Sequence, residues 1–115
     1  MRVAFSMLNG RIAPVFDSSR CLLILDIESG NTIEKIEHQF LNDNPYHKVR
    51  MIMIYEINII VCGAISQWMN TMLQSVGIQT IAFVSGEEQA IIKAFLKNKL
   101  NHPDYLMPGC KHINQ

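Results

Sequence analysis

Short apolar runs, separated by polar and glycine-containing segments, dominate the hydrophobic pattern of this chain. Three runs in the first 40 residues have the length of strands, at residues 2–7, 21–27 and 32–40. The second run is almost continuously apolar, which indicates burial on both faces of a sheet. The third run is more polar and suits an edge strand. Because Gly30 and Asn31 favour a tight turn between the second and third runs, the three predict an antiparallel meander.

Helical periodicity follows from residue 46 onward and alternates with two further apolar runs. Ser66 is a typical N-cap residue, and Ser85 with Glu88 has the spacing of a capping box. Gly77 and Pro103 are expected to end the last two helices. The pattern thus predicts strands at 57–63 and 78–84 and helices at 46–55, 66–77 and 85–103.

The element order β-β-β-α-β-α-β-α predicts an α/β protein with three helices. Right-handed crossovers through the helices make the last two strands parallel to the first. The expected sheet has five strands in the order 3-2-1-4-5, with only strand 2 antiparallel. Helices on both faces then give a three-layer, ribonuclease H-like fold. We expect a single domain over residues 1–115, in which residues 101–115 are a candidate flexible tail.

Composition excludes several classes of protein. The 115 residues are 49% apolar and carry 10 basic and 10 acidic side chains, so no basic excess points to nucleic acid. No apolar run is long enough to span a bilayer, and the start lacks the layout of a signal peptide. Three cysteines without a CxxC pair indicate free thiols. We expect a cytoplasmic protein with no membrane or nucleic-acid partner, and the sequence does not indicate its oligomeric state.

Catalytic motifs are missing from the sequence. A ribonuclease H-type nuclease needs clustered carboxylates, one of them on the first strand, to hold two magnesium ions. The first and fourth predicted strands carry no acid. GxSxG, Walker A, GxGxxG and HExxH motifs do not occur either. We therefore expect no enzyme activity and no catalytic residue.

A binding site is expected at the carboxyl ends of the parallel strands, where ligands bind in such sheets. The segment at residues 9–20 is longer than a hairpin needs, so it can wall a crevice there. The loops after residues 38, 62 and 84 should meet the same edge. Helix N-termini at Ser66 and Ser85 would make this edge receptive to anions.

Each candidate site residue also has a plain structural interpretation. Cys62 ends an apolar strand and is either core or ligand, and Phe16 is either a loop anchor or part of the site. His47 and His38 suit solvated surface positions as well as ligation. Cys110 and His112 are two residues apart, so in an extended segment both could face one metal ion. Cys21, inside an apolar strand, is expected to be inert.

The chain resembles the nitrogenase iron–molybdenum cofactor biosynthesis family over essentially its whole length. The resemblance rests on the order and spacing of "NGRIAPVF", "LLILDIESG", "NIIVCGAI", "GIQTIAFVSG", "EEQAIIKAFLKNKL" and "MPGC". It implies the same ribonuclease H-like fold. It also implies a non-catalytic role: binding an iron–sulfur or iron–molybdenum type cluster and passing it between donor and acceptor proteins.

The resemblance also suggests site residues. Within the family's first loop, Ile12, Pro14 and Phe16 match positions of the cofactor-binding segment, and Val15 stands where the family has its cofactor-binding histidine. Cys62 and Gly63 match the family's "CG" after the fourth strand.

Cys110 matches a cysteine of the family's tail. Because valine cannot ligate a metal, Cys110, His112 and His47 are the candidate metal ligands, together with Cys62. Two hypotheses stay open: a cluster carrier, or a module of the same fold that has lost metal binding and binds a small molecule, an anion or a protein.

Overall fold

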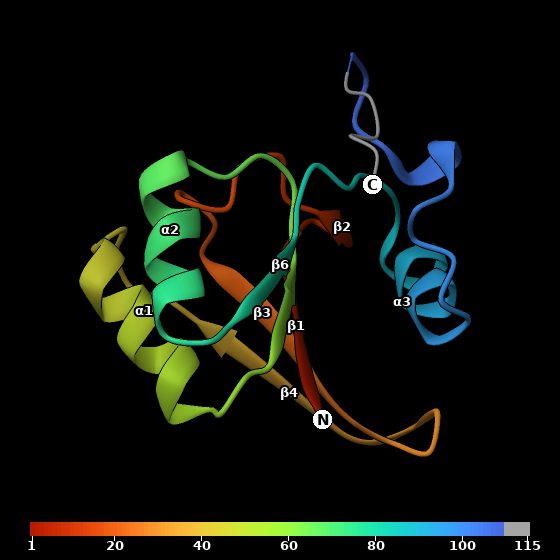
Figure 1. The fold of residues 1–115 in the computed structure, drawn as a ribbon, viewed down its shortest axis with the longest axis horizontal. Coiled ribbons are helices and arrows are strands. Elements are labelled where there is room, and N and C mark those ends of the chain that lie inside the picture. The colour runs from red at the N-terminus through yellow and green to blue at the C-terminus, as the bar shows by residue number, and fades with distance from the viewer. Residues whose placement is uncertain (110–115) are drawn as a thin grey trace.

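The computed structural model describes residues 1–109, which form a mixed α/β fold with three α-helices (Figure 1). Cys110 and His112 lie outside the described residues. The strands are β1 (Arg2–Leu8), β2 (Arg11–Ile12), β3 (Cys21–Glu28), β4 (Asn31–Gln39), β5 (Ile59–Val61) and β6 (Gln79–Ile81). The helices are α1 (Pro45–Ile54), α2 (Gln67–Ser75), α3 (Glu88–Leu96) and the 3₁₀ turn η1 (Pro103–Tyr105).

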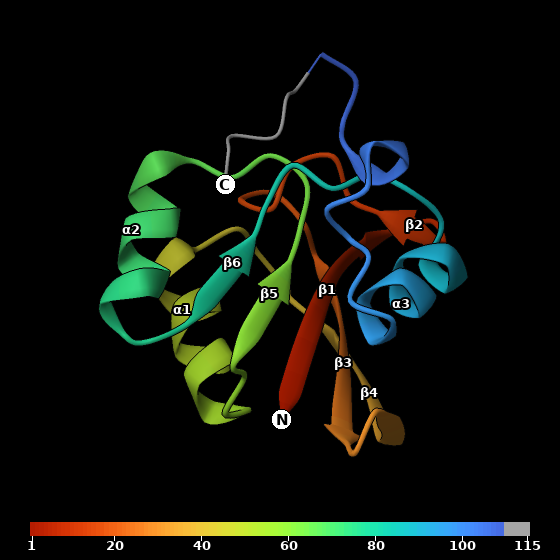
Figure 2. The ribbon, with the colours of Figure 1, turned by 45° about the vertical axis from the view of Figure 1, so that its right-hand side comes forward.

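The sheet has six strands, in the order β4-β3-β1-β5-β6 with β2 paired to β1 off this path (Figure 2). The predicted count of five strands is wrong, because β2 has only two residues and lies inside the predicted loop. β2 also runs antiparallel to β1, so the expectation that only one strand is antiparallel is wrong. β3 is antiparallel to β1 and β4, while β5 and β6 run parallel to β1 as expected.

Apolar side chains cover both faces of the sheet. Helices α1 and α2 pack on one face and α3 packs on the other, so the fold has three layers (Figure 1). Successive residues of β1 alternate between the two cores, with Ala4 on the α1–α2 side and Phe5 on the α3 side. β3 contributes to both cores, which confirms the burial predicted from its continuous apolar run. β4 is an exposed edge strand, also as predicted.

The first two helices begin at side-chain caps. The Asn44 side chain accepts hydrogen bonds from the backbone amides of Tyr46 and His47, and Pro45 occupies the first turn, where its missing N–H costs nothing. Ser66 caps α2 by accepting a bond of 3.1 Å from the Met69 amide, which confirms its predicted role. Gly77, with φ of +85°, follows the end of α2.

The third helix departs from the prediction at both ends. Its N-cap is Glu87 without a side-chain bond, so the expected capping box does not form. The Ser85 amide donates to the Tyr105 carbonyl instead, which ties residue 85 to the C-terminal segment. The helix ends at Leu96, well before Pro103, because Asn98 adopts a left-handed φ of 57°.

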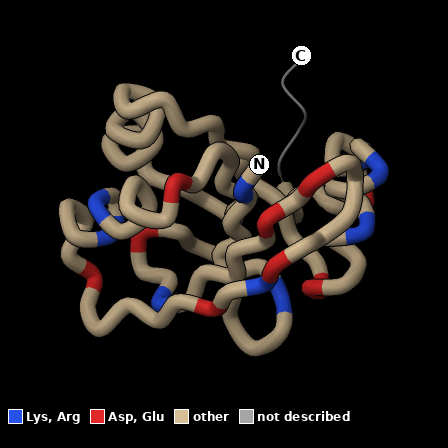
Figure 3. Tube along the Cα trace, turned by 90° about the horizontal axis from the view of Figure 1, so that it is seen from below, with Lys and Arg blue, Asp and Glu red and all other residues tan. Residues whose placement is uncertain are grey.

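The segment after α3 returns to the sheet edge. The Met107 amide donates to the Phe83 carbonyl, and Val84 and Leu106 form an antiparallel bridge. No helix within residues 1–109 is long and apolar enough to cross a membrane. Acidic and basic residues are interspersed along the chain (Figure 3).

Candidate functional site

Residues 9–20 are bonded along both sides to the loops after β5 and β6. On one side the Ala64 amide donates to Pro14 O, and the Phe16 amide donates to Ala64 O, each at 2.8 Å. On the other side the Ile12 amide donates to Gly86 O at 2.9 Å. These loops meet at the carboxyl ends of the parallel strands, as the sequence predicts. The segment is therefore a fixed wall rather than a free hairpin loop.

Gly63 allows this close approach. A Cβ atom at position 63 would lie 2.5 Å from the Ala13 carbonyl oxygen and 2.6 Å from that of Pro14. Both neighbours are backbone atoms, which cannot turn away as a flexible side chain can. Only glycine therefore lets residues 13–14 lie directly on the end of β5.

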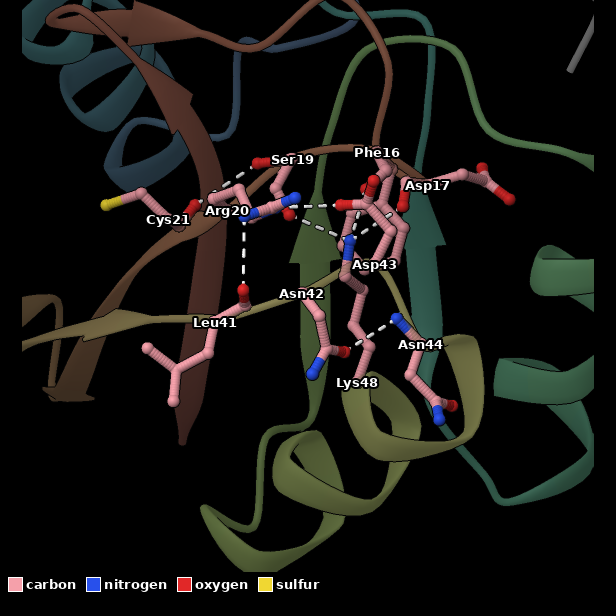
Figure 4. A network of polar contacts seen from close by, with 10 residues as sticks. All are labelled: Phe16, Asp17, Ser19, Arg20, Cys21, Leu41, Asn42, Asp43, Asn44 and Lys48. Carbon is pink, nitrogen blue, oxygen red and sulfur yellow. Dashed lines mark hydrogen bonds and ion pairs between the residues drawn. The ribbon is translucent and has the colours of Figure 1, made fainter.

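Lys48 holds the far end of the wall (Figure 4). Its side chain comes from the first turns of α1 and is only 1% exposed. The ammonium donates to the backbone carbonyls of Phe16, Asp17 and Ser19 at 2.9, 2.9 and 2.8 Å. Three donors thus meet three acceptors, which offsets the cost of burying the charge.

Aromatic rings complete the surroundings of this ammonium. The nitrogen lies 5.0 Å from the centre of the Phe16 ring and 5.3 Å from that of Phe40, within the range of cation–π attraction. Burial lowers the pKa of Lys48, while the negative charges of Asp43 and Asp17 act in the opposite direction. Sequence reasoning missed Lys48, although its place beside Val49 on the buried face of α1 was a usable signal.

Asp17 occupies the start of α2. Its carboxylate accepts from the Ser66 amide at 2.9 Å and from the Ser66 hydroxyl at 2.6 Å. The predicted anion-receptive end at Ser66 is thus already filled by an anionic side chain of the same chain. The matching expectation for Ser85 is also wrong, because α3 begins at Glu88 and Ser85 does not cap it.

A crevice of about 580 Å³ opens beside the wall, on the α3 side of the sheet. It is lined by the end of β1, much of segment 9–20, the start of β3, the end of β4 and Glu88 of α3. Pro14 and Val15 border it, and the Val15 side chain is 44% exposed. A second cavity of about 610 Å³ lies between β6, α3 and residues 98–106, and its described lining residues include no thiol, carboxylate or imidazole.

Among residues 1–109, the other predicted site residues do not line the crevice. Ile12 and Phe16 are buried in the cores and anchor the wall from behind. Cys62 is fully buried on the α1–α2 side of the sheet, and burial raises the pKa of its thiol to about 12. His47 is exposed in the first turn of α1.

Cys21 belongs to the apolar strand β3, as expected, and it also lines the crevice. It is the first residue of β3 and is half-buried, and its sulfur points away from the Lys48 contacts (Figure 4). Burial, with smaller effects of Glu37 and Glu88, raises the pKa of Cys21. Period-2 counting from Leu23, on the α3 face, would have placed it there.

Metal-ligating side chains do not form a ready-made cluster in this part of the chain. Within residues 1–109, no group of three or more His, Cys, Asp or Glu side chains is close enough to hold a metal ion. The described lining of the crevice therefore offers one thiol and two carboxylates, but not a closed tetrahedral site.

Several solved structures share the fold of this chain. The crystal structure of PH0822 superposes with a TM-score of 0.81 at 23% identity, covering 87% of this chain and 92% of that one. MJ0327 from Methanocaldococcus jannaschii gives a TM-score of 0.71 at 23% identity, covering 87% and 91%. The apo form of the orange protein from Desulfovibrio gigas gives 0.69 at 15% identity, covering 86% and 89%.

No curated protein sequence matches the chain. The structural likenesses, all below 25% identity, establish a shared fold and nothing further. At the level of sequence, the profile of the family described as "Dinitrogenase iron-molybdenum cofactor" matches residues 1–98, from β1 through the end of α3. This match spans most of the chain, and the chain therefore belongs to that family.

Proposed function

We propose that this protein is a non-enzymatic carrier or accessory protein that binds an iron–sulfur or iron–molybdenum type cluster in the crevice beside Pro14 and Val15. The observation that carries the proposal is the wall itself. Gly63 and Lys48 hold residues 13–19 in place, and the resulting crevice is bordered by the loop to which the sequence resemblance assigns cofactor binding. The proposal includes a ribonuclease H-like topology, a cytoplasmic location and cluster donor and acceptor proteins as partners.

The donor set decides how such a cargo would be held. Iron–sulfur species are bound through thiolates, and Val15 supplies no ligand. Cys62 is an unsuitable ligand, since its sulfur is enclosed in the core. The ligands in this proposal are Cys110 and His112, with Ile12, Pro14, Phe16 and Gly63 shaping the site. His47 lies in the first turn of α1 and does not line the crevice, so it is left out of the ligand set. A cargo held by few protein ligands is released readily, which suits a carrier.

Anaerobic reconstitution with iron and sulfide tests this function. We expect a coloured protein with stoichiometric iron, and a marked loss of cluster absorbance in Cys110→Ala, because one of few thiolate ligands is gone. Val15→His should increase cluster retention, because it places an imidazole at the border of the crevice. A colourless parent that resists reconstitution, together with no gain in Val15→His, would overturn the proposal.

The alternative function is protein interaction by a family member that has lost metal binding. It is favoured by an exposed aromatic pair: Tyr46 and Trp68 are 68% and 45% exposed, and their ring centres lie 5.6 Å apart in an edge-to-face arrangement. Exposed Tyr and Trp are typical of interface anchors. Anion binding is less favoured, because Asp17 fills the start of α2. Loss of partner capture in Tyr46→Ser, with reconstitution absent in the parent, would support this alternative.

A further inference from the structure

Two sulfur-containing residues lie on neighbouring strands at the crevice. Met7 of β1 and Cys21 of β3 are direct partners in the antiparallel register. Directly opposed residues in such a pair project from the same face of the sheet, with Cβ atoms about 4.5–5.5 Å apart. Both side chains line the crevice. Met7 is buried and Cys21 is half-buried, so the register brings a thioether and a thiol together at the edge of the cavity.

The charges around this pair favour a cation over an anion. Arg20, at the rim, is paired with Asp43 at 2.8 Å, and Glu88 is paired with Lys35 at 3.5 Å. Glu37 also lines the crevice, and no ion pair to it is formed within residues 1–109. After these pairings cancel, the carboxylate of Glu37 remains, so the described lining residues carry a net negative charge.

We propose that Met7 and Cys21 form a two-sulfur site for a soft monovalent cation, Cu(I) or Ag(I). Thiolate and thioether ligands select such ions, whereas harder cations prefer oxygen. A linear or bent two-ligand arrangement suffices for Cu(I), so the site needs no third protein ligand. On binding, the Cys21 thiol releases its proton to the buffer as the S–Cu bond forms, Met7 donates a sulfur lone pair, and no electron is transferred.

This site is independent of the proposed cluster function. An iron–sulfur cargo would depend on the tail and on iron and sulfide, whereas the present site depends on two residues of the sheet and on a single ion. Reconstitution with iron can fail while Cu(I) binding succeeds, and the reverse also holds. The two proposals are therefore tested by separate measurements.

Anaerobic titration of the full reduced chain with Cu(I), in competition with a coloured Cu(I) chelator, tests the site. We expect one tightly held equivalent. Cys21→Ser should weaken binding by at least about a hundredfold, and Met7→Leu, which conserves volume, by about tenfold. Met53→Leu, on the exposed part of α1, is a matched control that should stay within about twofold.

Protection of thiols from alkylation gives a second measurement on the unaltered protein. One equivalent of Ag(I) should slow the labelling of Cys21 by iodoacetamide, as located by peptide mass spectrometry. The proposal is overturned if Cys21→Ser binds Cu(I) as tightly as the parent. It is equally overturned if Cys110→Ser alone abolishes binding, or if Ag(I) leaves Cys21 labelling unchanged.

Discussion

The two faces of the sheet differ in how far their cysteines and charged side chains are buried and paired. On the α1–α2 face, Cys62 is fully enclosed and the Lys48 ammonium has a partner for every N–H. On the α3 face, Cys21 is half-buried and borders an open crevice, beside the carboxylate of Glu37. One face of the sheet is sealed and supports the wall, and the other is left open beside it.

The difference shows that the position of a cysteine at a strand end does not by itself predict whether its thiol is buried. Cys62 ends an apolar run and matches a family motif, whereas Cys21 opens an apolar run and matches none. The face of the sheet decides their environments. Cys62 projects with Ala4 and Ile60 into the sealed core, and Cys21 projects with Leu23 toward α3, where the helix does not cover it.

The largest expected difference between the two faces is in the rate at which Cys21 and Cys62 are alkylated. Cys21 should react with iodoacetamide in the native protein, whereas Cys62 should react only through unfolding. A fold of ordinary stability attenuates such labelling by a factor of at least about a thousand. Timed alkylation with peptide mass spectrometry separates the two sites.

Denaturant supplies the control for this measurement, since both thiols should label at similar rates once the chain is unfolded. Labelling of native Cys62 at a rate within tenfold of Cys21 would mean that the α1–α2 face is not sealed.

Removal of the Lys48 side chain should cause the largest loss of stability. Lys48→Ala leaves three buried carbonyl oxygens without their donor and opens a cavity between α1 and the wall. We expect a loss of about 3–5 kcal/mol in the free energy of unfolding, as for other broken buried charge contacts. Urea denaturation followed by circular dichroism measures it.

Two variants sharpen the interpretation of that loss. Lys48→Met keeps the apolar stem and should cost less than Lys48→Ala, because only the donors are lost. Lys93→Ala, on the exposed side of α3, should change stability by less than about 0.5 kcal/mol. Equal stabilities for Lys48→Ala and Lys93→Ala would show that the carbonyl contacts contribute nothing.

Asp17 should matter less than Lys48, because its contacts are partly solvated. Asp17→Ala removes both bonds to Ser66 and the negative charge at the start of α2. We expect a loss of about 1–2 kcal/mol, in the range of helix-cap contacts. Asp17→Asn, which keeps one acceptor oxygen, should fall between the parent and Asp17→Ala in the same denaturation experiment, and a more stable Asp17→Ala would contradict the assigned role.

Much of the fold was readable from the sequence because long apolar runs carry clear periodicity. The continuous run of β3, the edge character of β4 and the Ser66 cap were all predicted and are confirmed. β2 is not predicted, because two residues are too few to show an alternation of apolar and polar positions. The end of α3 was misplaced because Asn98, rather than Pro103, turns the chain.

The candidate site was less readable than the fold. The location of the wall followed from topology, since loops at one edge of a sheet must meet. The contacts of Lys48 and the exposure of Cys21 depend on which side chains remain uncovered after packing. Those outcomes arise from contacts between residues far apart in the sequence, such as the 32 positions between Phe16 and Lys48.

The smallest predicted effect concerns His38, on the sealed face. Its Nδ1 lies 2.9 Å from the Tyr55 hydroxyl, and its Nε2 is buried without a hydrogen-bond partner within the described part of the chain. Burial, and next the charge of His47, lowers the pKa of His38 below its ordinary value. As pH falls from about 7.5 to 5.5, the unfolded imidazole therefore takes up a proton before the native one does, and this disfavours the native state. The parent should therefore lose more stability over this range than His38→Gln. Urea denaturation at both pH values measures the difference, and parallel losses in the two proteins would show that burial on the sealed face does not disfavour protonation of His38.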